Sequence, residues 1–118
     1  MSKEEASENR TFTLDEARTL LPRVREITDR AADELSELAR AIQGIAEDDT
    51  RRAMLEQEYV ERLNNWVTDI QEVGAEVKGM FLVDFDNGEG YYCWKWPEQA
   101  VEHYHGYEEG FAGRMKIN

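Results

Sequence analysis

The sequence lacks the features that are typical of secreted and membrane proteins. It contains a single cysteine, Cys93, so no disulfide can form within the chain and nothing indicates an oxidising compartment. No apolar run approaches the roughly 18 residues that a membrane-spanning helix needs. The polar, acidic start of the chain, residues 1–5, is unlike a signal peptide. We therefore expect a cytoplasmic protein.

Positive charge is also scarce. The 14 Lys and Arg residues face 26 Asp and Glu residues, which gives a formal net charge of −12. This balance disfavours nucleic acids and anionic membranes as partners, because both are bound mainly through Lys and Arg. Such an acidic composition resembles that of proteins from a high-salt cytoplasm and suggests a halophile. Lysine is the rarer base, limited to Lys3, Lys78, Lys95 and Lys116.

The chain has no strong local signature of an enzyme. We find no Walker loop, no dinucleotide-binding glycine pattern, no paired cysteines for zinc, no HExxH motif and no serine nucleophile elbow. Most familiar enzyme classes are therefore disfavoured. The motifs indicate no cofactor, and whether the protein is an enzyme stays open.

What the chain does have is a long helical pattern. Its 118 residues fit one domain, and residues 1–10 are predicted to be a disordered acidic tail because they are too charged to bury. Thr13 and Glu16 form a capping box that starts a helix. Because proline breaks helices, Pro22 predicts a short first helix and a kink before a longer one. The apolar stripe, mainly in steps of three and four, is Leu14, Ala17, Leu20, Leu21, Val24, Ile27, Ala31, Leu35, Leu38, Ile42 and Ile45.

A second helical stripe follows an acidic connection at residues 44–50. The two stripes predict an antiparallel helical hairpin over about residues 13–74, ended by Gly74 in a left-handed cap. The second stripe consists of Leu55, Tyr59, Leu63, Trp66, Val67, Ile70 and Val73.

Residues 75–118 change to a β-rich pattern. A strand over residues 77–85, a turn over 86–90 and a return strand over 91–96 predict a β-hairpin. A third strand is expected over residues 101–107, with helix as an alternative. An ordered loop over residues 110–114, pinned by Phe111, completes the pattern. On that third strand one face would carry Val101, His103, His105 and Tyr107.

The expected fold is therefore α+β, a long antiparallel helical hairpin packed with a small C-terminal antiparallel β-sheet. We expect residues 11–118 to form a single domain.

Polar and aromatic side chains gather between residues 84 and 114, so any functional site is expected there. His103 and His105 would share one face of a strand, where they could bind a metal with Asp84 or Glu108. The alternative interpretation has no metal: one histidine is solvated at the surface, and the other is a hydrogen-bonded structural residue. This situation is the more common one.

Other residues of this region have two interpretations each. Cys93 could act as a nucleophile with His105 as its base, although a small buried residue on the inner face of the hairpin is the more common role. Arg114 could present its guanidinium to a carboxylate or phosphate ligand, or it could pair with a carboxylate of the chain and lock the tail onto the sheet. The carboxylates available for that pairing are Asp84, Glu98 and Glu108. The aromatic residues Trp94, Trp96, Tyr104 and Tyr107 could line a pocket, but structural use is favoured.

Several segments carry a resemblance to a known family. They are residues 12–17 (FTLDEA), 82–85 (LVDF), 92–95 (YCWK), His105 and 110–114 (GFAGR). Together they resemble a prokaryotic family catalogued as domain of unknown function 2203, some of whose members are labelled "division initiation protein". The resemblance covers nearly the whole chain after the tail. It implies a small prokaryotic protein and no particular enzyme activity.

The resemblance also implies which polar residues recur. By motif position they are Asp84, Glu98, His105, Glu108 and Arg114. The chain departs from the family pattern where Tyr104-His105-Gly106 replaces the usual Trp-His-Glu. His103 has no counterpart in the pattern, so a paired histidine metal site loses weight against His105 acting with Arg114 and the carboxylates.

We expect a non-enzymatic interaction or structural module that self-associates through its helices into a homo-oligomer, most simply a dimer. A hairpin with a small sheet leaves apolar helix surface uncovered, and pairing through a two-fold axis would bury it. The alternative is a small-ligand or metal-binding protein, with or without catalysis, whose metal the sequence does not specify. The candidate ligand-binding residues are Asp84, Cys93, Glu98, His105, Glu108 and Arg114.

The acidic charge predicts stability that depends on salt. Repulsion within a chain of net charge −12 is screened as salt rises, because the Debye length falls from about 30 Å at 0.01 M to about 3 Å at 1 M. We expect the melting temperature, followed by circular dichroism, to rise steeply from low to molar KCl. A melting temperature that stays flat over this range contradicts the expectation.

Overall fold

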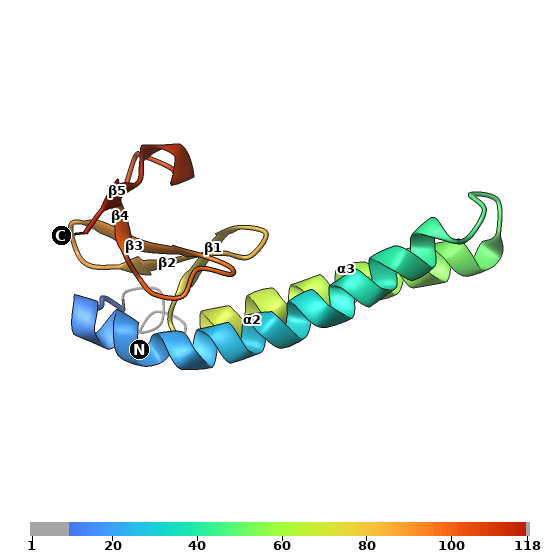
Figure 1. The fold of residues 1–118 in the computed structure, drawn as a ribbon, viewed down its shortest axis with the longest axis horizontal. Helices are drawn as coiled ribbons and strands as arrows, with labels where there is room; N and C mark the ends of the chain where they lie inside the picture. The colour runs from blue at the N-terminus through green and yellow to red at the C-terminus, as the bar shows by residue number, and fades with distance from the viewer. Residues whose placement is uncertain (1–9, 118) are drawn as a thin grey trace, which may run out of the picture.

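The computed structural model describes residues 10–117 and contains two long helices and a five-stranded antiparallel sheet (Figure 1). The predicted α+β fold is confirmed. The disordered tail predicted for residues 1–10 lies, apart from Arg10, outside the described residues. The elements are α2 (Leu14–Gln43), α3 (Thr50–Glu72), β1 (Glu76–Gly79), β2 (Leu82–Asp86), β3 (Gly90–Lys95), β4 (His103–Gly106), η1 (Phe111–Gly113) and β5 (Met115–Lys116).

The predicted capping box starts α2. Thr13 Oγ1 accepts a hydrogen bond from the Glu16 backbone N–H at 3.1 Å, and the Glu16 carboxylate accepts one from the Thr13 N–H at 2.8 Å. The predicted break at Pro22 is wrong, because α2 runs without interruption from Leu14 to Gln43. Leu21 and Val24, on either side of the proline, are buried in the core. Their packing offsets the loss of one helical hydrogen bond and the crowding of the ring, a cost of about 3 kcal/mol.

The connection before α3 and the end of α3 agree with what the sequence predicts. Asp49 caps α3 by accepting a hydrogen bond from the Arg51 N–H at 2.9 Å. Gly74 follows α3 with φ of 92°, in the left-handed region that glycine adopts without strain. No helix among residues 10–117 is both long and apolar enough to cross a bilayer.

The core lies between one end of the hairpin and one face of the sheet (Figure 1). At its centre the Trp66 indole N–H of α3 donates to Thr28 Oγ1 of α2 at 2.9 Å, and the same hydroxyl donates to the Val24 carbonyl at 2.8 Å. Both side chains are fully buried. The core consists of Phe12, Ala17, Leu21, Val24, Ala31, Trp66, Ile70, Ala75, Val83, Phe85, Trp94 and Val101.

The single strand expected over residues 77–85 is wrong, because the chain turns back at Met80 and Phe81 and forms two strands, β1 and β2. Phe81 has φ of 59°, which costs a non-glycine residue roughly 1–2 kcal/mol. Its ring meets those of Trp66 and Trp96 edge to face, at centroid distances of 5.3 and 5.5 Å. These aromatic contacts over the helices hold the turn in place.

The C-terminal elements also differ from the expectation. The third strand exists as β4 but is shorter, and Val101 precedes it and lies in the core, so the face expected for Val101 is wrong. The loop expected over residues 110–114 is instead a 3-10 turn, η1, followed by a fifth strand, β5. Phe111 is 41% exposed rather than buried, and the Arg114 guanidinium stacks 4.2 Å from its ring centre.

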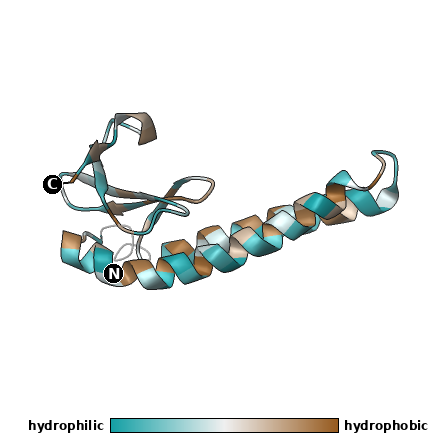
Figure 2. Cartoon of the chain, viewed as in Figure 1, coloured by the Kyte–Doolittle hydropathy of each residue, from teal (hydrophilic) through white to brown (hydrophobic). Residues whose placement is uncertain are grey.

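The far part of the hairpin projects away from the sheet (Figure 1). We call residues 36–65 the arm. The buried side chains of α2 end at Leu35, and those of α3 begin at Trp66, so no side chain of the arm is fully buried. Apolar residues nevertheless continue along both helices of the arm (Figure 2).

We predict that the buried hydroxyl of Thr28 is essential to the packing of α2 against α3. Replacing it (Thr28→Val) keeps the shape of the side chain but leaves the Trp66 N–H buried without an acceptor. We expect urea unfolding to show a loss of about 1–3 kcal/mol. The control is Thr68→Val, the same change at an exposed position of α3, which should alter stability by less than about 0.5 kcal/mol. Equal losses in the two variants contradict the prediction.

Candidate functional site

One face of the sheet packs on the helices, and the other carries most of the candidate residues. Val83 and Phe85 of β2 lie in the core together with Trp94 of β3. Side chains alternate along a strand, so Asp84 and Cys93, which are paired in register, point to the opposite face. We call this the outer face of the sheet.

Asp84, Cys93 and His105 form a buried cluster on the outer face. Their exposed fractions are 1%, 0% and 4%, and one potential ligand atom from each lies within 4.8 Å of the other two. His105 Nε2 is 2.8 Å from Asp84 Oδ2. Gly90 lets β4 approach, because a Cβ at that position would lie 2.6 Å from the His105 carbonyl oxygen. The cluster thus combines one residue from each of three neighbouring strands, β2, β3 and β4.

The histidine ring is fixed by two acceptors. Its Nδ1 lies 2.8 Å from the Gly106 carbonyl oxygen, which can only accept, so Nδ1 carries a proton. Its Nε2 faces the Asp84 carboxyl group, so a second proton lies between Nε2 and Oδ2. Burial raises the pKa of Asp84, against the opposing influence of the Cys93 thiol and His105. Asp84 Oδ1 is buried and has no hydrogen-bond partner within residues 10–117.

Cys93 is not activated as a nucleophile. Burial and the neighbouring Asp84 carboxyl group raise the pKa of the thiol to about 12, with only a partial counter-effect from Arg114. A thiolate is the reactive form of cysteine, and at neutral pH it would be scarce here. The thiol is buried as expected, but on the polar outer face rather than in the apolar core.

Arg114 covers the cluster and pairs with Glu98. Its two terminal nitrogens contact the two Glu98 carboxylate oxygens at 2.9 and 3.1 Å, and its Nη1 lies 4.0 Å from Cys93 Sγ. Burial alone would raise the pKa of Glu98, but the hydrogen bonds from Arg114 and the Lys95 N–H outweigh it and lower that pKa. The guanidinium is thus engaged by a carboxylate of the same chain.

The remaining candidates lie apart from the cluster. Glu108 is exposed, with no hydrogen bond or ion pair to another described residue. His103 shares the outer face, but its Nδ1 is 3.9 Å from Glu98 and has no hydrogen bond within the described part of the chain.

Sequence reasoning placed Tyr107 on the face of His103 and His105 but missed Tyr91. The Tyr91 ring lies 5.4 Å from that of His105, and its hydroxyl contacts Glu76 and Lys78 of β1, each at 3.2 Å. Tyr107 donates to Asp86 at 2.6 Å. The alternation of Tyr91 with Cys93 was the available signal, but β1 had not been separated from β2.

A comparison with family models places the chain among its relatives. The model described as "Uncharacterized conserved protein (DUF2203)" matches residues 10–117, nearly the whole sequence. The chain belongs to this family. No curated protein and no solved structure matches it.

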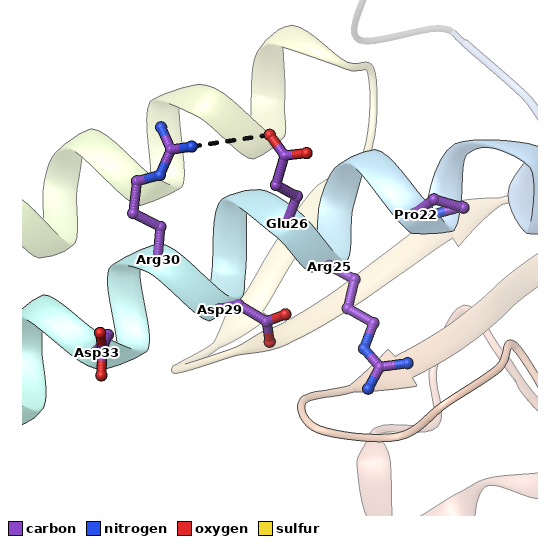
Figure 3. Close-up of a pocket in the computed structure, with 6 residues that line it drawn as sticks. All are labelled: Pro22, Arg25, Glu26, Asp29, Arg30 and Asp33. Carbon is purple, nitrogen blue, oxygen red and sulfur yellow. Dashed lines mark ion pairs between the residues drawn. The ribbon is translucent and has the colours of Figure 1, made fainter.

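A shallow pocket of this DUF2203 protein lies elsewhere, on the outer surface of α2 (Figure 3). Its charged side chains do not converge: Glu26 pairs with Arg30 at 3.8 Å, while Asp29 accepts a hydrogen bond from the Trp96 indole at 2.7 Å. We interpret it as a solvated helix face. Its lining residues are Pro22, Arg25, Glu26, Asp29, Arg30 and Asp33.

We predict that the Arg114–Glu98 pair makes the DUF2203 chain sensitive to acid. A carboxyl group whose pKa is lowered by folding stabilises the fold above its ordinary pKa of 4.5, and this contribution is lost as the pH falls through the lowered value. Glu98→Gln should therefore cost about 1–2 kcal/mol at neutral pH, and the gap to the unaltered chain should close in acid.

Urea unfolding over a series of pH values measures this gap. The matched control is Glu108→Gln, which removes an exposed carboxylate and should produce no gap at any pH. A gap for Glu98→Gln that does not change between neutral and acidic pH is the contrary result.

Proposed function

We propose that this protein is a non-enzymatic interaction module that self-associates through its helices, most simply as a dimer. The observation that carries the proposal is an uncharged stripe along α3, largely solvent-exposed, in a chain of which 34% is charged. Its positions are spaced alternately by four and three residues, the repeat of a coiled-coil seam. The seam consists of Ala53, Gln57, Val60, Asn64, Val67 and Gln71, of which Val67 is half-buried against the core.

The seam has the character of an interface rather than of ordinary helix surface. Val60 is 53% exposed, and Met54, which follows the seam residue Ala53 in the chain, is 72% exposed. Interface centres are depleted of charged residues and enriched in methionine. Polar, uncharged residues such as Gln57 and Asn64 lower the stability of a seam but fix its register. The exposed surface of α2 is different, because it carries Arg23, Glu26, Arg30, Asp33, Glu37 and Arg40.

A second copy of the chain is the partner that this seam suits. Two copies of net charge −12 repel each other, and burying acidic groups against acidic groups would cost several kcal/mol. A two-fold pairing of uncharged seams brings the helices together without such burial. The arm, in which no side chain is fully buried, would gain the most from this pairing.

The outer face of the sheet supports a non-enzymatic role. His105 is paired with Asp84, and Arg114 with Glu98, so most of the polar groups there are engaged with one another, Asp84 Oδ1 and His103 Nδ1 excepted. The Cys93 thiol is protonated at neutral pH, and the cluster is covered rather than open. A cytoplasmic location, with an acidic surface adapted to high salt, belongs to the same proposal.

The test is sedimentation velocity of the chain and of Val60→Glu at high concentration in 1 M KCl. We expect the unaltered chain to sediment as a dimer, and lowering the KCl concentration should weaken the association because repulsion is no longer screened. Val60→Glu places two like charges in the seam and should raise the dissociation constant at least about tenfold.

The control is Thr19→Glu, which adds the same charge at an exposed position of α2 outside the arm. It should dimerise like the unaltered chain, and circular dichroism should show both variants folded. A monomer at high concentration in 1 M KCl, or equal weakening by both substitutions, would refute the proposal.

A further inference from the structure

The outer face of the sheet contains donor groups whose placement suits a metal ion. We propose that Asp84, Cys93 and His105 bind a divalent transition-metal ion of the zinc class through one oxygen, one sulfur and one nitrogen. This site goes beyond the proposed self-association and uses none of the residues of the seam.

The donor atoms are almost in place. The three potential ligand atoms lie within 4.8 Å of one another. A tetrahedral ion with bonds of about 2.0–2.3 Å keeps its donors about 3.3–3.8 Å apart. The Asp84–His105 contact of 2.8 Å would therefore open slightly, and any donor pair farther apart than about 3.8 Å would close. Both are side-chain adjustments on strands already paired in register.

The histidine already has the orientation of a metal ligand. Histidine ligands commonly donate their second ring N–H to a backbone carbonyl, which fixes the tautomer and aims the other nitrogen at the ion. His105 Nδ1 lies 2.8 Å from the Gly106 carbonyl oxygen in this way, and Nε2 points into the cluster.

A second, independent observation is the carboxylate itself. Asp84 is 1% exposed, yet its Oδ1 has no hydrogen-bond partner among the described residues. A buried oxygen without a partner costs free energy, and a bound cation would remove that cost.

Charge neutrality favours an ion of charge two. Without an ion, the thiol is neutral, and the Asp84–His105 pair with its shared proton is neutral as well. When the ion binds, the Cys93 S–H bond and the bond to the shared proton break, both protons leave to solvent, and bonds form from the ion to sulfur, oxygen and nitrogen. Thiolate, carboxylate and neutral imidazole then balance the ion, so the buried cluster carries no net charge in either state.

The mixture of donors selects the class of ion. Ca²⁺ and Mg²⁺ take oxygen ligands, whereas thiolate and imidazole together favour Zn²⁺ and its chemical relatives. The neighbouring Arg114 would repel a cation, but its charge is balanced by Glu98 at 2.9 Å. Lys78 is similarly engaged by Glu76, also at 2.9 Å.

Co²⁺ is the probe that tests the site in the full chain. We expect one equivalent of Co²⁺ to produce the absorption of a tetrahedral ion with a sulfur-to-cobalt charge-transfer band, and Zn²⁺ to displace it. Zn²⁺ should also raise the melting temperature as its concentration rises, and a chelator should reverse that rise.

Cys93→Ser keeps the shape of the residue and should abolish the charge-transfer band, and His105→Gln should weaken Co²⁺ binding at least about tenfold. The matched control is His103→Gln, which alters a histidine on the same face of the same strand outside the cluster and should keep the band. Circular dichroism establishes that each variant is folded.

Absence of the sulfur-to-cobalt band in the unaltered chain overturns the proposal, as does a band that survives Cys93→Ser. Loss of the band in His103→Gln as well as in His105→Gln would contradict the three-residue site. Because the seam of α3 is not involved, these results are independent of whether the chain dimerises.

Discussion

The rest of the structure depends on the contacts of Trp66, which link the two helices to each other and to the sheet. Its indole N–H binds Thr28 of α2, and its ring meets Phe81 in the turn between β1 and β2. Phe81 in turn meets Trp96 at the end of β3. These contacts fix one face of the sheet on the helices. Because side chains alternate along strands, they also determine that Asp84 and Cys93 must face away from the apolar core.

The helices could be predicted in most detail, because local signals specify them. The capping box at Thr13 and the left-handed Gly74 were both correct. Two of the errors in regular structure have clear tertiary causes. The helix continues through Pro22 because neighbouring residues are buried in the core, and the chain turns at Phe81 because two tryptophans receive its ring. Neither the core packing beside Pro22 nor the aromatic packing of Phe81 can be predicted from the local sequence, since each joins segments far apart in the chain.

The candidate site could be predicted as a region but not as a geometry. The sequence correctly indicated a strand carrying His103 and His105 on one face, but only strand register decides that His105 reaches Asp84 while His103 turns to Glu98. The contact of Arg114 with a carboxylate of the chain was one of two interpretations left open, and it could not be assigned to Glu98 because three carboxylates were available. Burial of polar groups on the outer face depends on these mutual pairings, which leave little net charge to desolvate.

The negative net charge limits where close contacts can form, both on the outer face of the sheet and along α3. In a chain of charge −12, close contact is costly wherever acidic groups would be brought together or buried alone. In the described part of the chain, two places avoid this cost: the uncharged seam along α3, and the cluster around Asp84, which its protons keep neutral and which the proposed divalent ion would keep neutral as well. They lie on different elements, the seam on α3 and the cluster on β2, β3 and β4. Assembly and ion binding would therefore occupy separate surfaces, and neither would require the other to be vacant.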